Sequence, residues 1–439
     1  MAVGESLAPG TVLGELRFQN DADWWIKVHD VGALWRAQPT YILAQAAYLI
    51  GALFTLIHAL SSRGRWAQLW IATVFHGLVV ESLSYVLPDV DNFWHSQTPL
   101  IFLGRRLPLH IAFLYPVFIY QATVAVSKLR LPRWAEPCAV GLTVVLIDIP
   151  YDIMCVKFVH WTWHDTDPNI GDRHYWVPWN SYYFHATFAA AFTFWFHLLR
   201  DHPRRWQRVA RDALNLVMAS LLGTPLGVLM FPMLYHTFHD IYKVHSEVTF
   251  FALFAVFLAV SWAGTLSAAK DPVVVAKESL FKCWRPGERS ASWRTWLLVS
   301  HLALHYALWM WMAAFGRPER EVSTGLHEPT GPCGVRAPMQ TASGLVLEKD
   351  KYLCKTDYDE KYFDFHCLPG GEPPRDGAHW YTICGTPFEN RAEYILVIGT
   401  ITLTALIVFF NMHFRAAPDS ALLRPGAAGP NKQAKLKTR

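Results

Sequence analysis

Three carboxylates lie inside stretches of this chain that are apolar enough to cross a bilayer. Glu81 stands in HGLVVESLSY, and Asp148 and Asp152 stand in LTVVLIDIPYDIM. A charge near the centre of a membrane span costs at least about 2.5–3.5 kcal/mol, so such residues usually face the interior of a helix bundle and serve a function there. A carboxylic acid in apolar surroundings favours its protonated form and can give that proton to a carbon–carbon double bond. The three residues are therefore candidate catalytic groups, with a helix-to-helix hydrogen-bond clamp as the structural alternative.

The two aspartates share one face of a helix because they are four residues apart. Pro150 lies between them, and it should kink the helix beside the acids because it lacks a backbone N–H. We predict that Asp148 or Glu81 is the acid. Asp152 is its expected partner, which holds water or takes the final proton.

Candidate substrate-binding residues gather at the same membrane face as these acids. Aromatic ring faces stabilise a carbocation by about 0.5–2 kcal/mol each, and an amide or an imidazole can orient a substrate. The candidates are Trp161, Trp163, His164, Tyr175, Trp176, Asn180, His110 and His185. A belt of tryptophans at the membrane interface would place the same aromatic residues at this depth without a catalytic role.

The composition indicates a polytopic membrane protein. Of the 439 residues, 52% are hydrophobic and only 17% are charged, and the mean hydropathy of +0.16 is high for a soluble enzyme. Windows of about 20 apolar residues predict an all-α fold with about nine transmembrane helices. These spans are expected at 40–60, 66–88, 107–127, 134–156, 181–199, 212–234, 246–268, 295–315 and 393–413.

Lys and Arg residues gather in alternate loops between the predicted spans. Arg63 and Arg65 follow the first span, Lys128 and Arg130 follow the third, and the loops after the fifth and seventh spans and the C-terminal tail are also basic. Because basic loops stay in the cytosol, the N-terminus is expected to be lumenal or extracellular and the C-terminus cytosolic. The net charge of +4 is concentrated in these loops, so the charge gives no indication of nucleic-acid binding.

Four of the seven cysteines lie in one predicted lumenal segment. They are Cys333, Cys354, Cys367 and Cys384. An even set among glycine–proline clusters predicts a small insertion with two disulfides in an oxidising lumen, and three pairings are possible. A zinc site is the alternative, but none of the four cysteines has CxxC spacing.

These signals divide the chain into seven segments. They are a lumenal N-terminal segment (1–39), a seven-helix membrane core (40–268), a basic cytosolic loop (269–294), an eighth transmembrane helix (295–315), a lumenal cysteine-containing module (316–392), a ninth transmembrane helix (393–413) and a basic cytosolic tail (414–439). Lys435 and Lys437, fifth and third from the end, resemble a dilysine retrieval signal. We therefore expect a multi-pass protein of the endoplasmic reticulum membrane.

The order of several motifs resembles a known family. A span with Glu81 precedes Leu-Gly-Arg-Arg-Leu-Pro at 103–108, then the pair Asp148-x-x-x-Asp152, then Trp161-x-Trp163, and then Tyr-Trp-Val-Pro-Trp-Asn at 175–180. Over about residues 66–200 this order is similar to the membrane-embedded carotenoid biosynthesis family that includes the bacterioruberin-pathway carotenoid hydratases. The resemblance implies an isoprenoid-type substrate and an acid-initiated addition to an alkene, or its cyclisation.

The expected function is thus acid–base chemistry, of hydratase or cyclase type, on an isoprenoid or another lipid in a lumen-facing intramembrane cavity. The expected partners are membrane lipids and a hydrophobic small-molecule substrate, with no cofactor and no metal; the oligomeric state stays open. One alternative is a non-enzymatic transporter or a lipid-binding or scaffold protein, because intramembrane acids also serve proton coupling. A second is a lipid oxidase whose metal is ligated by histidine pairs with one-face helical spacing. These pairs are His160/His164, His236/His239 and His301/His305, the last of which is also explained as a buried hydrogen-bonding pair.

Overall fold

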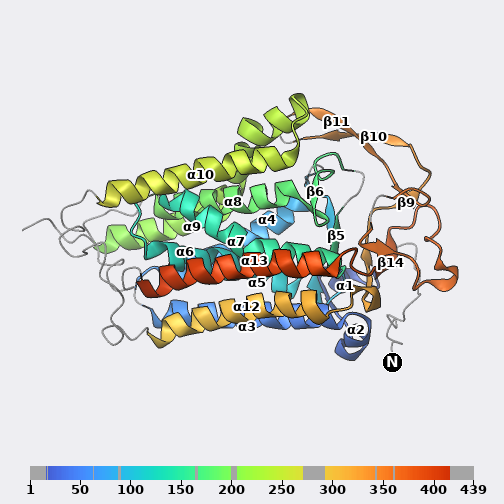
Figure 1. Cartoon of the computed structure of the whole chain (residues 1–439), viewed down its shortest axis with the longest axis horizontal. Helices are drawn as coiled ribbons and strands as arrows, with labels where there is room; N and C mark the ends of the chain where they lie inside the picture. The colour runs from blue at the N-terminus through green and yellow to red at the C-terminus, as the bar shows by residue number, and fades with distance from the viewer. Residues whose placement is uncertain are drawn as a thin grey trace, which may run out of the picture.

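The computed structural model describes residues 16, 18–62, 64–87, 90–163, 167–198, 205–269, 292–341, 344–358 and 361–415. Most of these residues form long helices that lie side by side, and many of the strands gather at one end of the bundle (Figure 1). Nearly all of the predicted cytosolic segments 269–294 and 414–439 falls outside the described residues.

Seven helical segments among the described residues are long and apolar enough to cross a membrane. They are α3 (Pro39–Ser61), the continuous segment α5 (Leu109–Tyr115), η1 (Pro116–Tyr120) and α6 (Gln121–Ser127), α7 (Glu136–Lys157), α9 (Arg205–Phe231) with η2 (Pro232–Ile241), α10 (Ser246–Ala269), α12 (Trp293–Phe315), and α13 (Arg391–Phe410) with η5 (Asn411–Arg415). The chain is therefore a mostly helical, multi-pass membrane protein. Pro116 and Pro232 each begin a π-helical turn, and both lack the backbone N–H that a regular α-helical turn needs.

The predicted spans 66–88 and 181–199 also form helices, but these two are not among the seven. They are α4 (Trp66–Ser84) and α8 (Trp179–His197), each of 19 residues. Polar side chains interrupt both of them, with His76 and Glu81 in α4 and His185 in α8. Both pack within the bundle, since α4 contacts α9 and α8 contacts α7 and α9.

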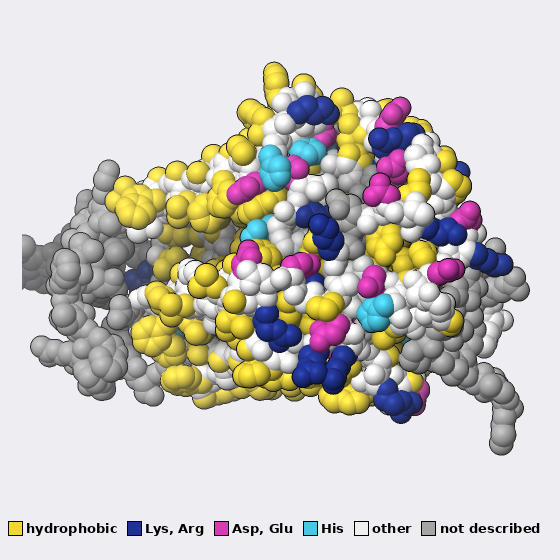
Figure 2. All heavy atoms as spheres, turned by 45° about the vertical axis from the view of Figure 1, so that its right-hand side comes forward, with side chains coloured by type: hydrophobic (Ala, Val, Ile, Leu, Met, Phe, Trp, Pro, Cys, Tyr) yellow, Lys and Arg dark blue, Asp and Glu magenta, His cyan; other side chains and the backbone are white. Residues whose placement is uncertain are grey.

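The surface of the bundle divides into an apolar part and a polar part. Apolar side chains cover the helices, whereas Lys, Arg, Asp and Glu gather over the end that carries the strands (Figure 2). Large apolar side chains such as Trp262 of α10 and Leu396 of α13 are 67% and 69% exposed. A bundle whose sides face lipid tails has this distribution.

The described residues of 316–392 form a small module, where a cysteine-containing insertion in an otherwise all-α chain was predicted, and the structure shows that this module is built from β-strands. Strand β14 (Trp380–Gly385) pairs with β8 (Val322–Leu326) and with β13 (Phe363–Asp364). Further ladders join β10 (Arg336–Gln340) to β11 (Val346–Asp350) and β9 (Thr330–Gly331) to β12 (Leu353–Cys354). Glycine and proline recur through this segment and prevent long helices.

The predicted disulfides are confirmed. Of the three possible pairings, the structure has Cys333 bonded to Cys354 and Cys367 bonded to Cys384. The second bond ties the strand β14 to the segment that follows β13. The disulfides thus hold together a module too small to be stabilised by a large core of its own.

Short elements beside the module complete the polar end. They are α1 (Asp21–Trp25), α2 (Val31–Ala37), the sheet of β1 (Ile26–Val28), β3 (Leu100–Phe102) and β4 (Leu107–Pro108), the pair of β2 (Phe93–His95) and β5 (Trp161–Trp163), and the pair of β6 (Arg173–His174) and β7 (Val177–Pro178). The backbone N–H of Gln97 donates to the carbonyl oxygen of Thr324 at 2.9 Å, so the segment after β2 is bonded to the module.

Helices α7 and α8 approach each other closely at Gly141. A Cβ atom at this position would lie 2.5 Å from the carbonyl oxygen of Ala186 in α8. Only glycine allows this distance, because backbone atoms cannot move aside as a flexible side chain can. The contact sets the spacing of the two helices that carry Asp148, Asp152 and His185.

A buried carboxyl group at the junction between α12 and the module provides a test of this packing. Glu321 is 3% exposed, and burial raises its pKa to about 8 although hydrogen bonds with Thr40 oppose the shift. The folded chain therefore binds more protons than the unfolded chain between the ordinary glutamate pKa and about 8, so stability falls as the pH rises through this window. We expect the unfolding temperature of the purified protein to fall from pH 5 to pH 8, and Glu321→Gln to reduce that fall.

The control for this prediction is Glu348→Gln on the exposed side of β11, which should leave the wild-type pH profile unchanged. Parallel profiles for wild type and Glu321→Gln, measured by thermal unfolding in detergent, would contradict the prediction.

Candidate functional site

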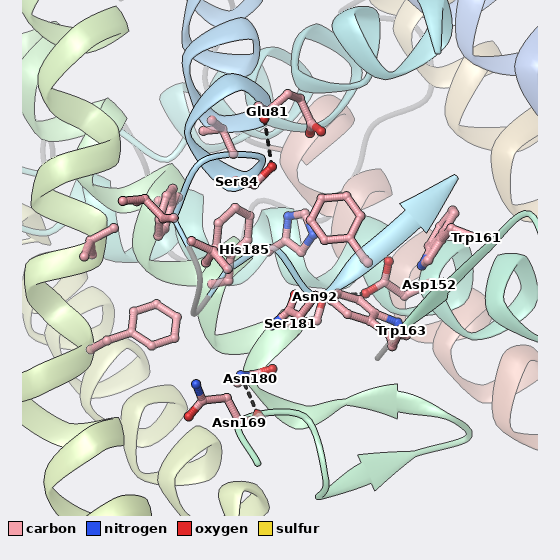
Figure 3. Close-up of a pocket in the computed structure, with 18 of the residues that line it drawn as sticks. Glu81, Ser84, Asn92, Asp152, Trp161, Trp163, Asn169, Asn180, Ser181 and His185 are labelled. Atoms are coloured by element: carbon pink, nitrogen blue, oxygen red, sulfur yellow. Dashed lines mark hydrogen bonds between the residues drawn. The ribbon is translucent and has the colours of Figure 1, made fainter. Parts of the chain in front are cut away.

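A cavity lies between α4, α5, α7, α8 and α9 with η2, next to the pair β2 and β5. It contains about 1170 Å³ of empty space, part of which is open to the surroundings, and most of its wall is apolar. Six of the predicted site residues line it (Figure 3). They are Glu81, Asp152, Trp161, Trp163, Asn180 and His185.

Asp152 lies in the cavity wall, and Asp148 lies one helical turn away along α7. Both are buried, with exposures of 3% and 0%. The hydroxyl of Ser181 in α8 donates to Asp152 Oδ2 at 2.7 Å. His185 Nε2, also from α8, lies 3.2 Å from Asp148 Oδ1. The two aspartates share one face of α7, as predicted from their four-residue spacing, and the structure shows that this face meets α8. Pro150 lies between them inside a continuous helix.

Glu81 enters the cavity from α4 and is held by two tyrosines. Tyr115 of α5 donates to Glu81 Oε1 at 2.9 Å, and Tyr85 donates to Oε2 at 3.4 Å. Glu81 is 5% exposed, so this carboxyl group is shielded from bulk solvent and lies between these hydroxyls and the cavity. No sequence pattern pointed to Tyr115, which is 34 residues away in another helix, whereas Tyr85 stands four residues after Glu81 and that spacing was an available signal.

The two tryptophans of the cavity wall lie on a strand rather than on a helix. Trp161 and Trp163 belong to β5, which pairs antiparallel with β2, with Trp163 opposite Phe93 and Trp161 opposite His95. The ring of Trp161 lies 4.9 Å from that of Tyr151, which also lines the cavity. Asn180 donates its Nδ2 to the carbonyl oxygen of Asn169 at 2.7 Å, which fixes the loop that closes this side.

Three predicted substrate-binding residues do not line this cavity. His110 is buried against Tyr41, with ring centroids 5.3 Å apart. Tyr175 donates to Glu393 at 2.6 Å, and Trp176 donates to Glu389 at 3.1 Å, so both contact residues at or just before the start of α13. Their adjacency to Pro178 and Asn180 in sequence misled the prediction, because the β6–β7 hairpin turns them outward, with Tyr175 and Trp176 at its tip. His164, the remaining candidate, falls outside the described residues.

Several polar groups in the wall were not assigned to the site from the sequence, and one of them, His236, is an imidazole with a carboxylate partner. His236 of η2 lines the cavity, and its Nδ1 lies 2.7 Å from Asp240 Oδ2. His239 Nδ1 contacts the other oxygen of Asp240 at 2.7 Å. A carboxylate bonded to one ring nitrogen fixes the orientation of the imidazole. The spacing His-x-x-x-Asp on a helix was the available signal, but it is common by chance.

The pair His301 and His305 is engaged in hydrogen bonds within the core. The two nitrogens of His301 contact Gln121 Nε2 at 2.6 Å and the carbonyl oxygen of Ala47 at 3.2 Å. Those of His305 contact the hydroxyl of Tyr48 at 3.4 Å and the carbonyl oxygen of Ile147 at 3.0 Å. These contacts correspond to the buried hydrogen-bonding pair rather than to metal ligands. His160 likewise contacts Thr40 at 2.9 Å and stacks on Tyr41.

The fold and the cavity together define a polytopic helical membrane protein with a buried site of carboxylates, imidazoles and aromatic rings. A family model described as "Domain of unknown function (DUF7802)" matches residues 15–414, and the chain belongs to this family. No curated protein and no solved structure matches the chain.

Proposed function

We propose that this protein is an acid–base enzyme, of hydratase or cyclase type, that acts on an isoprenoid or another lipid. The observation that carries the proposal is the convergence of Glu81, Asp152 and His185 from three helices on one aromatic-walled cavity. Large apolar pockets with a few converging polar groups are the usual form of small-molecule sites. The resemblance of residues 66–200 to the carotenoid hydratase family supports the isoprenoid class.

The proposed reaction uses groups in the cavity wall. Protonated Glu81 gives its proton to one carbon of the alkene, and the cation left on the other carbon faces Trp161, Trp163 and Tyr151. For a hydratase, Asp152 holds the water whose oxygen then bonds to the cation. The added water then loses one of its two protons to a carboxylate and keeps the other as the product hydroxyl. The net reaction adds one water to one double bond.

We propose nine spans, a lumenal N-terminus and module, a cytosolic C-terminus and residence in the endoplasmic reticulum. The helical length of α4 and α8, 19 residues each, supports the two additional spans. The two disulfides support a lumenal module, because disulfides persist in oxidising compartments. The cavity lies toward the module end of the bundle, since β2 and β5 border it, so it is on the lumenal side in this topology.

The test of this function is untargeted lipid analysis of cells that express the wild type, Asp152→Asn or Glu81→Gln at matched protein levels. We expect a lipid or isoprenoid that the wild type alters and that both variants leave at the level of cells without the protein. Asp350→Asn, on the module's β11, is the control and should behave as wild type. An unchanged lipid profile with wild type, while all variants fold, would overturn the enzyme proposal in favour of a transporter or scaffold.

A further inference from the structure

We propose that Asp148, Asp152 and His185 bind one divalent transition-metal ion, with Zn²⁺ as the reference ion, in the wall of the cavity. This inference rests on the proposed function because it places a cofactor in the same cavity. The metal can nevertheless be measured without any assay of turnover.

The three side chains offer ligand atoms at a spacing that suits a single ion. One oxygen from each aspartate and one nitrogen of His185 all lie within 4.8 Å of one another. The aspartates come from one face of α7, and His185 faces them from α8. Ligands at about 2.0–2.2 Å from a common zinc ion stand at most about 4.4 Å apart, so a small side-chain adjustment closes the site.

Asp148 is a buried group that lacks a regular hydrogen-bond donor. It is 0% exposed, and in the described part of the chain neither Oδ1 nor Oδ2 meets the geometry of a hydrogen bond; it interacts with the neighbouring Asp152, which can supply a hydrogen bond only if one of the two carboxyl groups carries a proton. His185 Nε2 lies 3.2 Å from Oδ1 but out of line for a hydrogen bond. Leaving such atoms unsatisfied is expensive in apolar surroundings. An ion between Asp148 and His185 would satisfy both.

Charge balance also favours a divalent cation. Two carboxylates side by side away from water repel each other, whereas two carboxylates, a neutral imidazole and a divalent cation sum to zero. A nitrogen and two oxygens, without sulfur, suit Zn²⁺, Mn²⁺ or Fe²⁺ better than copper(I). Ser181 donates to Asp152 Oδ2 at 2.7 Å, which is the kind of outer hydrogen bond that orients metal-binding carboxylates.

The proposed ion has an open side toward the cavity. Asp152 and His185 line the cavity, whereas Asp148 does not, so a fourth ligand can come from the cavity side. A water held there is placed to add to the cation that Glu81 generates. The water's O–H proton then returns to the Glu81 carboxylate, which restores the acid.

A second group of potential ligands among the described residues lacks this character. Asp364, His366 and Cys384 are also close together, but Cys384 is bonded to Cys367 and has no thiolate to offer. This group supports no metal site.

The experiment is elemental analysis of the full-length protein, purified in detergent with a tag free of histidine. We expect about one ion per chain in the wild type, restored by Zn²⁺ after chelation, and at least about tenfold less in Asp148→Asn, Asp152→Asn and His185→Gln. Glu81→Gln is the matched control, since Glu81 lines the same cavity without joining the cluster, and it should keep the ion. Zn²⁺ should also raise the unfolding temperature of the stripped wild type and of Glu81→Gln, but not of the three ligand variants.

Wild-type protein that neither carries an ion nor takes up Zn²⁺ or Mn²⁺ would overturn the proposal, as would equal metal content in folded ligand variants. The asparagine variants keep the shape of the aspartates and should fold. An unfolding temperature measured in parallel identifies any variant that does not fold, and in that case the metal content of His185→Gln decides whether the site exists. Metal bound without any lipid change would leave this site in place and contradict the proposed function. A lipid change produced by a metal-free protein would support the proposed function and contradict the metal site.

Discussion

Replacing Glu81 by glutamine is expected to lower product formation by about 10²–10⁴-fold, the usual contribution of a general acid. Glutamine has nearly the same shape, and its carbonyl oxygen can still accept the hydrogen bond from Tyr115, which is 2.9 Å long in the wild type. The unfolding temperature should therefore change little while turnover is lost. The measurement is conversion of the lipid identified by untargeted analysis, with wild type and variant in the same detergent.

This prediction separates catalysis from a helix clamp. If Glu81 only joins α4 to α5 through Tyr115, Glu81→Gln retains turnover, whereas Tyr115→Phe lowers the unfolding temperature. Full activity in Glu81→Gln would thus remove Glu81 from the mechanism. Glu348→Gln on exposed β11 serves as the control for loss of a carboxylate.

The largest expected effect on stability comes from a buried ion pair at the polar end of the bundle. Arg105 Nη2 lies 2.9 Å from Asp23 Oδ2, with side-chain exposures of 2% and 7%. The guanidinium also lies over the ring of Trp380, 5.4 Å from its centroid, so it links α1, the loop between β3 and β4, and the module. Without Arg105, Asp23 loses a buried charged hydrogen bond but keeps Lys27, whose Nζ lies 2.9 Å from Oδ1, as an ion-pair partner. We expect Arg105→Met to lower the free energy of unfolding by about 2 kcal/mol.

The neighbouring arginine provides the control. Arg106 pairs with Asp91 at 2.5 Å, but the side chains are 17% and 34% exposed. Such pairs contribute about 0–1 kcal/mol to stability. Arg106→Met should therefore lower the free energy of unfolding at least about twofold less than Arg105→Met. The double variant Arg105→Met/Asp23→Asn should recover part of the loss, because the buried Asp23 charge is then removed, while Lys27 is 20% exposed and can be solvated. Equal losses for both arginines, measured by unfolding in detergent, would contradict the assignment.

This pair also explains the Leu-Gly-Arg-Arg-Leu-Pro motif at 103–108 in structural terms. Leu103, Gly104 and Arg105 have positive φ angles of 51°, 65° and 62°, so the loop between β3 and β4 turns tightly and directs Arg105 into the protein. From the sequence, this motif contributed only to a resemblance. Its partner Asp23 is 82 residues away, and no local pattern connects the two.

Local patterns were sufficient for the helices and the disulfide module. The span predicted at 40–60 is α3 at Pro39–Ser61, and the span predicted at 134–156 is α7 at Glu136–Lys157. A helix that crosses a membrane must satisfy its own backbone hydrogen bonds, so length and hydrophobicity indicate it without tertiary information. The four cysteines were recognisable for a similar reason, since their even number and close spacing predict bonds, although not their pairing.

By itself, then, the sequence determined the membrane character, the helices, the presence of two disulfides and the shared face of Asp148 and Asp152. Only the tertiary structure decided which helices meet, and with it the partners of the acids. His185 reaches Asp148, and Ser181 reaches Asp152, because Gly141 lets α7 approach α8. The same structure turns Tyr175 and Trp176 away from the cavity toward Glu393 and Glu389. These outcomes depend on side-chain packing between segments far apart in the chain, which local hydrophobicity and spacing do not encode.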